Sequence, residues 1–198
     1  MKYVNQLEYP HWLYVTRTQM ETPEMREKGK TTTIRSSGCG LCSAVMVADR
    51  LIPNCDFDLK AALDISYETE ANYKRGTSYT RFAPAFAKKL GLKYQPTDDV
   101  EELKECLKTG GAAVAYVVEE NDRVGLFTHG KHYIAVIGIE ADGRVAILDP
   151  SYFEGKYEEE GRAGKIEMKC GVIALCDPSV LDINCGTENA SYHLFWRE

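Results

Sequence analysis

The feature that most constrains this fold is a change in residue pattern near residues 110 and 111. Before it, apolar residues recur at the spacing of amphipathic helices; after it come short runs rich in β-branched and aromatic residues. The pattern predicts helices over residues 41–51, 58–67, 80–90 and from Asp98 or Asp99 to about 107. It predicts strands over residues 31–34, 112–118, 132–139, 144–148, 171–175 and 192–196. This order indicates an α+β fold, with N-terminal helices packed on a C-terminal antiparallel sheet.

Size, charge and cysteine content narrow the class of protein. A chain of 198 residues, 44% hydrophobic and 27% charged, suits a single globular domain over residues 1–198. The formal net charge of −6, without a basic stripe, argues against nucleic acid or an anionic membrane as a partner. No stretch approaches the roughly 20 apolar residues of a membrane span, and the N-terminus lacks a secretory signal, so we expect a cytoplasmic protein. Seven scattered cysteines favour reduced thiols over a disulfide framework.

One cysteine lies where a thiol can become reactive. Cys39 stands between Gly38 and Gly40, directly before the helical pattern of residues 41–51, which places it at or beside a helix N-terminus. The two glycines would permit the backbone turn that leads into the helix. The unpaired N–H groups and the dipole of a helix N-terminus favour a thiolate there. The N–H of Cys39 is also a natural donor to an oxyanion.

A histidine and an aspartate are predicted to meet at the ends of a hairpin. His132 opens one predicted strand, Asp149 ends the next, and Asp142-Gly143 forms the turn between them. The carboxylate could then accept the ring N–H of His132 and fix its tautomer. The sequence therefore predicts Cys39 as nucleophile, His132 as base and Asp149 as the orienting residue, with no metal and no cofactor.

These segments resemble a known family. SSGCGLCSAVMVADRL, GKHYIAVIGI and AILDPS are similar to the corresponding motifs of papain-like cysteine peptidases of the bacteriocin-processing type, a resemblance that covers roughly residues 1–150. It implies a papain-like fold, a peptide or isopeptide bond as substrate, and an upstream glutamine as second oxyanion donor. Thr33 occupies the common position of that glutamine, so Gln6 is the preferred candidate and Gln19 the other. Leu41 and Cys42 follow the Gly-Cys-Gly turn where the family often has proline.

Other interpretations of the same residues remain. The chain could be a papain-fold module that binds peptides or a partner protein without turnover. Cys39 and Cys42 form a CxxC pair that could bind zinc with His129 and His132, or act as a redox pair. His129 also competes with His132 as the base, and Cys42 could be a packing residue or a resolving thiol. The charged segment 154–169 is predicted to be a solvated loop.

Overall fold

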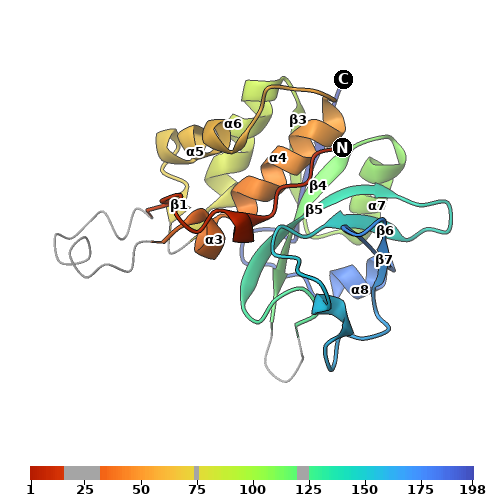
Figure 1. Ribbon diagram of the computed structural model, residues 1–198. Helices are drawn as coiled ribbons and strands as arrows, with labels where there is room; N and C mark the ends of the chain where they lie inside the picture. The colour runs from red at the N-terminus through yellow and green to blue at the C-terminus, as the bar shows by residue number, and fades with distance from the viewer. Residues whose placement is uncertain (16–31, 74–75, 120–124) are drawn as a thin grey trace.

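The computed structural model describes residues 1–15, 32–73, 76–119 and 125–198 (Figure 1). The helical elements are η1 Gln6–Glu8, α3 Ile34–Ser37, α4 Cys39–Leu51, α5 Leu59–Glu68, α6 Tyr79–Leu90, α7 Val100–Lys108, η2 Lys156–Glu158 and α8 Pro178–Asp182. The strands are β1 Asn72–Tyr73, β2 Gly76–Thr77, β3 Lys93–Thr97, β4 Ala112–Val118, β5 Lys131–Ile139, β6 Val145–Leu148, β7 Glu167–Lys169, β8 Ile173–Cys176 and β9 Tyr192–Trp196. The described part of the chain holds no helix that is both long and apolar enough to cross a membrane.

The four predicted helices form where local sequence signals place them. Asp58 caps α5 by accepting the N–H of Ala61 at 2.8 Å, and Asp99 caps α7 by accepting the N–H of Glu101 at 2.7 Å. Gly91 ends α6 with a φ of +65°, a left-handed conformation that a glycine adopts without steric cost. These caps fix the helix limits within one or two residues of the predicted ranges.

Seven strands form one antiparallel sheet in the order β3-β9-β4-β5-β6-β8-β7. Strands β5 and β6 are the predicted hairpin, with Ala135 opposite Leu148 and Gly143 in the connecting turn at a φ of +88°. The last strand, β9, lies between β3 and β4. The predicted α+β fold is confirmed.

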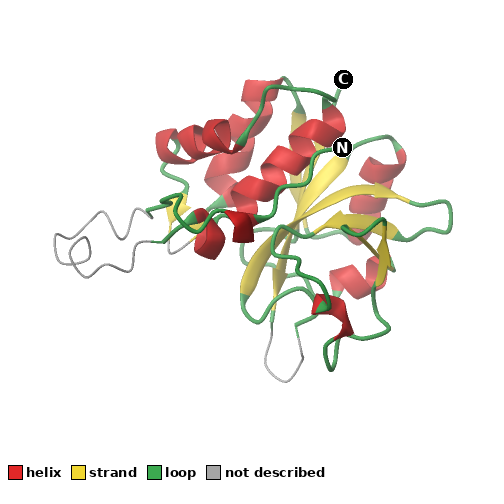
Figure 2. Ribbon diagram, viewed as in Figure 1, coloured by secondary structure: helices red, strands yellow, loops and turns green. Residues whose placement is uncertain are grey.

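Helices cover both faces of the sheet (Figure 2). On one face, Ala135 and Ile137 of β5 belong to a buried cluster with residues of α4, α5 and α6. On the other face, Ile134 and Val136 pack in a second cluster with α7 and α8. Side chains alternate across a strand, so burial on both faces explains why β4 and β5 are almost continuously apolar. Helix α7 therefore lies opposite the three helices that precede it.

Short edge elements account for most of the differences from the predicted pattern. The predicted strand 31–34 is wrong: Thr33 makes one isolated bridge to Leu13, Ile34 begins α3, and residue 31 lies outside the described ranges. Strands β3 and β7 were not predicted. Both lie at the edges of the sheet and are largely exposed, so their residues do not show the apolar alternation of a half-buried strand.

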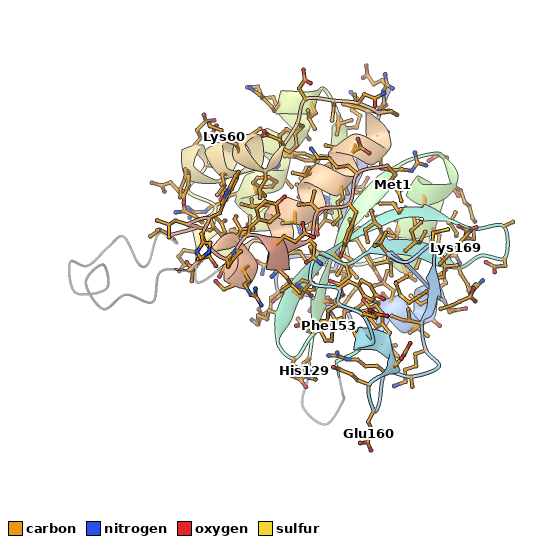
Figure 3. The ribbon with its side chains drawn as sticks, viewed as in Figure 1. Met1, Lys60, His129, Phe153, Glu160 and Lys169 are labelled. Atoms are coloured by element: carbon orange, nitrogen blue, oxygen red, sulfur yellow. The ribbon has the colours of Figure 1, made fainter. Side chains whose placement is uncertain are left out.

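The charged segment 154–169 is not a solvated loop throughout, and that prediction is wrong for three residues. Lys156, Tyr157 and Arg162 are buried, with Arg162 only 2% exposed. The Arg162 guanidinium binds the Glu159 carboxylate at 2.6 Å and donates to the Gly125 carbonyl at 3.2 Å. Nearby Glu160, by contrast, extends away from the molecule (Figure 3). Composition alone does not reveal buried cations, because their burial depends on partners supplied by other elements.

Candidate active site

Cys39 is the first residue of α4, as predicted, and only 9% of its surface is exposed. The flanking glycines serve close packing rather than an unusual turn. Gly38 has an ordinary φ of −91°, and a Cβ there would lie 2.7 Å from Ile34. A Cβ at Gly40 would lie 2.8 Å from the ring of Tyr79, whose hydroxyl donates to the Gly40 carbonyl at 2.6 Å. Tyr79 thus holds the start of α4 from the side of α6.

The β5–β6 hairpin brings His132 and Asp149 together. Each lies two residues from a strand residue of the second core cluster, Ile134 and Ile147, so both side chains emerge on the same face. His132 Nε2 is 2.8 Å from Asp149 Oδ1, and both side chains are buried. The His132 ring also lies close enough to the Cys39 thiol to lower the pKa of that thiol. Because Nε2 faces Asp149, Nδ1 is the ring nitrogen that remains for the thiol.

Cys39, His132 and Asp149 shift one another's pKa values. Burial by itself would raise the pKa of Cys39, but the hydrogen bond and charge of His132 lower it below its ordinary value. Burial would lower the pKa of His132, yet the Asp149 carboxylate, with help from Cys39, raises it to about 9. The pKa of Asp149 lies well below its usual range, because His132 and then Lys156 outweigh the effect of burial. These directions favour a thiolate–imidazolium pair at neutral pH.

Asp149 has further partners that the sequence did not predict. Its Oδ2 accepts from the Lys156 ammonium at 2.5 Å and from the Tyr157 hydroxyl at 2.7 Å. Its Oδ1 accepts from the backbone N–H of Ser151 at 2.8 Å and from the Ser151 hydroxyl at 3.0 Å. The Asp-Pro-Ser sequence is a recognisable turn signal for Ser151. No local sequence signal marks Lys156 and Tyr157, because only the tertiary fold places them beside Asp149.

Cys39 and His132 line a cleft of about 670 Å³. Small and hydroxyl-bearing residues form part of its wall, among them Ser36, Ser37, Thr77 and Ser78. Charged side chains of both signs also line it: Arg81, Lys131 and Glu188, the last two joined in an ion pair. The cleft is therefore polar and has room for an extended segment of polypeptide next to the thiol.

Gln6 lies between the two halves of the site. Its backbone N–H donates to the Pro150 carbonyl at 2.7 Å, and its side-chain Nε2 donates to the Arg35 carbonyl at 2.7 Å. Its Oε1 is buried without a hydrogen-bond partner. The amide thus lies next to the segment that leads into Cys39, and its role as oxyanion donor stays a prediction. Gln19 lies outside the described residues.

The alternative site residues are engaged elsewhere. His129 Nε2 is 3.0 Å from the Arg162 guanidinium, and Nδ1 is 3.6 Å from Glu119. Cys42 is fully buried in the first core cluster, and burial and nearby Cys39 hold its pKa far above the ordinary value. All seven cysteines are free thiols. Across the described ranges no three His, Cys, Asp or Glu residues come together as a metal-binding group.

An α+β fold with a buried cysteine opening the long helix α4, beside the histidine of β5, is the architecture of papain-like cysteine peptidases. The chain belongs to the Peptidase_C39-like family, whose model matches residues 3–169. Membership indicates a cysteine peptidase. The structure is similar to that of a Bacillus anthracis protein provisionally assigned as a C39-like peptidase, with a TM-score of 0.50 and 13% identity over 81% of this chain and 88% of that chain. At this identity the similarity supports the fold alone, and no curated protein matches the chain.

Proposed function

We propose that this protein is a cysteine hydrolase that cleaves a peptide or isopeptide bond through Cys39, His132 and Asp149. The observation that supports this most directly is the arrangement of the three side chains: His132 lowers the pKa of the Cys39 thiol and is hydrogen-bonded to the Asp149 carboxylate, and Cys39 and His132 line one cleft. Family membership gives the reaction class independently.

The proposed reaction is acyl transfer to water. The Cys39 thiolate attacks the amide carbonyl and forms a C–S bond, while the N–H of Cys39, and in our proposal the Gln6 amide, donate to the oxyanion. The His132 imidazolium gives its proton to the leaving amine, the C–N bond breaks and a thioester remains. His132 then takes a proton from water, the resulting hydroxide adds to the thioester, and the acid leaves as Cys39 regains its thiolate.

A peptide or protein substrate fits the character of the site. The cleft has a volume of about 670 Å³, and its wall offers hydroxyl groups and paired charges to polar side chains or backbone amides. The net charge of −6 does not favour nucleic acid or an anionic membrane surface.

Selective alkylation tests this proposal without a known substrate. Iodoacetamide at pH 6, followed by mass spectrometry of the cysteine peptides, should modify Cys39 at least roughly tenfold faster than exposed Cys170, because only a thiol paired with a histidine is largely ionised there. The preference should disappear in His132→Ala and persist in the control His129→Ala. Equal rates at the two cysteines in the wild-type protein would overturn the proposal and favour a binding module.

A further inference from the structure

Lys156 is a buried ammonium that shares the Asp149 carboxylate with His132. The side chain of Lys156 is 4% exposed and that of Asp149 is 1% exposed. Lys156 Nζ lies 2.5 Å from Oδ2 of Asp149, and His132 Nε2 lies 2.8 Å from Oδ1. The carboxylate of the proposed triad is therefore held between two groups that can both carry positive charge.

The hydrogen bonds around Asp149 leave it little freedom. Oδ1 accepts from His132 and from the backbone and hydroxyl of Ser151, while Oδ2 accepts from Lys156 and Tyr157. A carboxylate offers about four lone-pair directions, so these donors saturate it. Lys156 Nζ also donates to the Ser151 hydroxyl at 2.8 Å, which links it to the His132 side of the carboxylate. The Asp149 carboxylate therefore cannot turn both of its oxygens toward His132 without breaking its hydrogen bonds to Lys156 and Tyr157 of η2.

The charges that face Asp149 come from several elements. His132 approaches from β5, while Ser151 and the pair Lys156 and Tyr157 approach from the segment after β6. Tyr3, near the N-terminus, donates its hydroxyl to the Asp149 carbonyl at 2.7 Å. Of these groups, His132 and Lys156 are the two that can balance the negative charge of Asp149. In a buried site each such charge acts strongly on the others, since little water screens them.

We propose that Lys156 is a positioning residue of the peptidase: by sharing Asp149, it weakens the hold of the carboxylate on the His132 imidazolium and keeps that ring able to release its proton. This inference rests on the proposed function. In the first half of that reaction the imidazolium must give its proton to an amine, and in the second half the neutral ring must accept one from water. A buried carboxylate without a second cation would favour the imidazolium throughout and oppose the first of these steps, the release of the proton to the leaving amine.

A titration of the His132 ring tests this directly. The chain has four histidines, so the ring C–H resonances are few, and His132→Gln identifies the one of interest by its loss. The wild-type midpoint should lie at about 9. In Lys156→Met, which keeps the shape of the side chain and removes its charge, the midpoint should rise by about one pH unit or more.

Two further variants separate charge from structure. Lys156→Arg keeps the cation and should hold the midpoint close to the wild-type value. Lys165→Met removes one exposed lysine from the same segment and should leave the midpoint unchanged. A residue that serves only to anchor the segment would lower stability without moving the His132 titration. Equal midpoints in the wild type and in Lys156→Met would overturn the proposal.

A second measurement on the wild-type protein covers the case in which Lys156→Met does not fold. With ¹⁵N-labelled lysine, the Lys156 ammonium resonance should shift at the same midpoint as His132, because both groups bind one carboxylate. Absence of that shift would contradict the proposal. Selective Cys39 alkylation is measured on the same samples: its absence overturns the proposed function, whereas an unresponsive His132 with intact Cys39 reactivity overturns the role of Lys156 alone.

Discussion

At the scale of single residues, the candidate site contains a buried pair of opposite charges, Asp149 and Lys156. The Asp149 carboxylate also binds His132, which faces the Cys39 thiol. Asp149 and Lys156 are both almost completely excluded from solvent and lie 2.5 Å apart. Removing one partner of such a pair leaves the other as an uncompensated buried charge, which costs far more than the net contribution of the pair. Stability at this position therefore depends on charge balance rather than on either residue alone.

This balance gives a prediction for Asp149→Asn. The variant keeps the shape of the side chain but leaves the Lys156 ammonium buried without a counter-ion, so the free energy of unfolding should fall by about 3–5 kcal/mol. The double variant Asp149→Asn with Lys156→Met removes both charges and should regain a large part of that loss. Urea denaturation at pH 7 measures both. A double variant less stable than Asp149→Asn would contradict the account of this pair.

At the scale of elements, the start of α4 is fixed by a contact from α6. Tyr79 is fully buried, packs its ring against the position where Gly40 would carry a Cβ, and donates its hydroxyl to the Gly40 carbonyl. Because Cys39 precedes Gly40, any displacement of this turn of helix also displaces the thiol. The two glycines of the Gly-Cys-Gly sequence are thus a requirement of helix–helix packing.

We therefore expect Gly40→Ala to be destabilising. The added Cβ would lie 2.8 Å from the Tyr79 ring and 3.2 Å from Thr77, and neither neighbour can withdraw into solvent because both are buried. Overpacking of this kind costs about 1–3 kcal/mol. Gly130→Ala is the matched control, since a Cβ there meets nothing within 4 Å. Thermal unfolding that gave the same midpoint for the two variants would refute this packing argument.

The sequence predicted the elements whose signals are local. The helix limits and the Asp142-Gly143 turn were readable because the caps and the turn act on the backbone within a few residues. The placement of Cys39 at the start of α4, and of His132 beside Asp149 at the ends of the β5–β6 hairpin, was readable for the same reason. Edge strands β3 and β7 were missed because their exposed residues do not alternate in polarity, and α7 could not be assigned to a face of the sheet from its own sequence.

The buried cations were missed for a different reason. Lys156 and Arg162 lie in a segment whose composition is that of a solvated loop, and their burial depends on Asp149 of the hairpin end and on the Gly125 carbonyl. Such partners can be identified only in the folded structure, because the residues next to a charged side chain in the sequence do not indicate that it will be buried. These two buried cations were therefore outside the reach of sequence patterns.

At the scale of the whole molecule, the sheet is shared by two core clusters. Helices α4, α5 and α6 bury one face and helices α7 and α8 the other, so neither cluster is complete without the strands between them. This arrangement supports the prediction of one domain over residues 1–198, which stays a prediction. His193 of β9 lies fully buried within the sheet, with its Nδ1 2.9 Å from the Tyr94 hydroxyl of β3.

Burial of His193 predicts acid sensitivity of the whole fold. Loss of water around the ring lowers the pKa of His193 to about 4 from an ordinary value of 6.5. Between these pH values the unfolded chain binds a proton at His193 that the folded chain does not bind. The free energy of unfolding therefore decreases as the pH falls from 6.5 toward 4, by at most about 3 kcal/mol. His193→Gln should weaken this dependence when unfolding is measured at pH 7.5 and 4.5, whereas exposed His11→Gln should not. An unchanged pH slope in His193→Gln would contradict the prediction.

The position of β9 has a consequence for synthesis. Strand β3 pairs only with β9 in the described sheet, and β9 also completes the edge of β4, yet residues 192–196 are translated long after both partners. A ribosome-bound chain that has already formed the α4 region and the β5–β6 hairpin would still expose two unpaired strand edges. The sheet can therefore be completed only after residues 192–196 have been synthesised. Until then, the unpaired strand edges of the nascent chain must be kept from pairing with exposed strands of other chains.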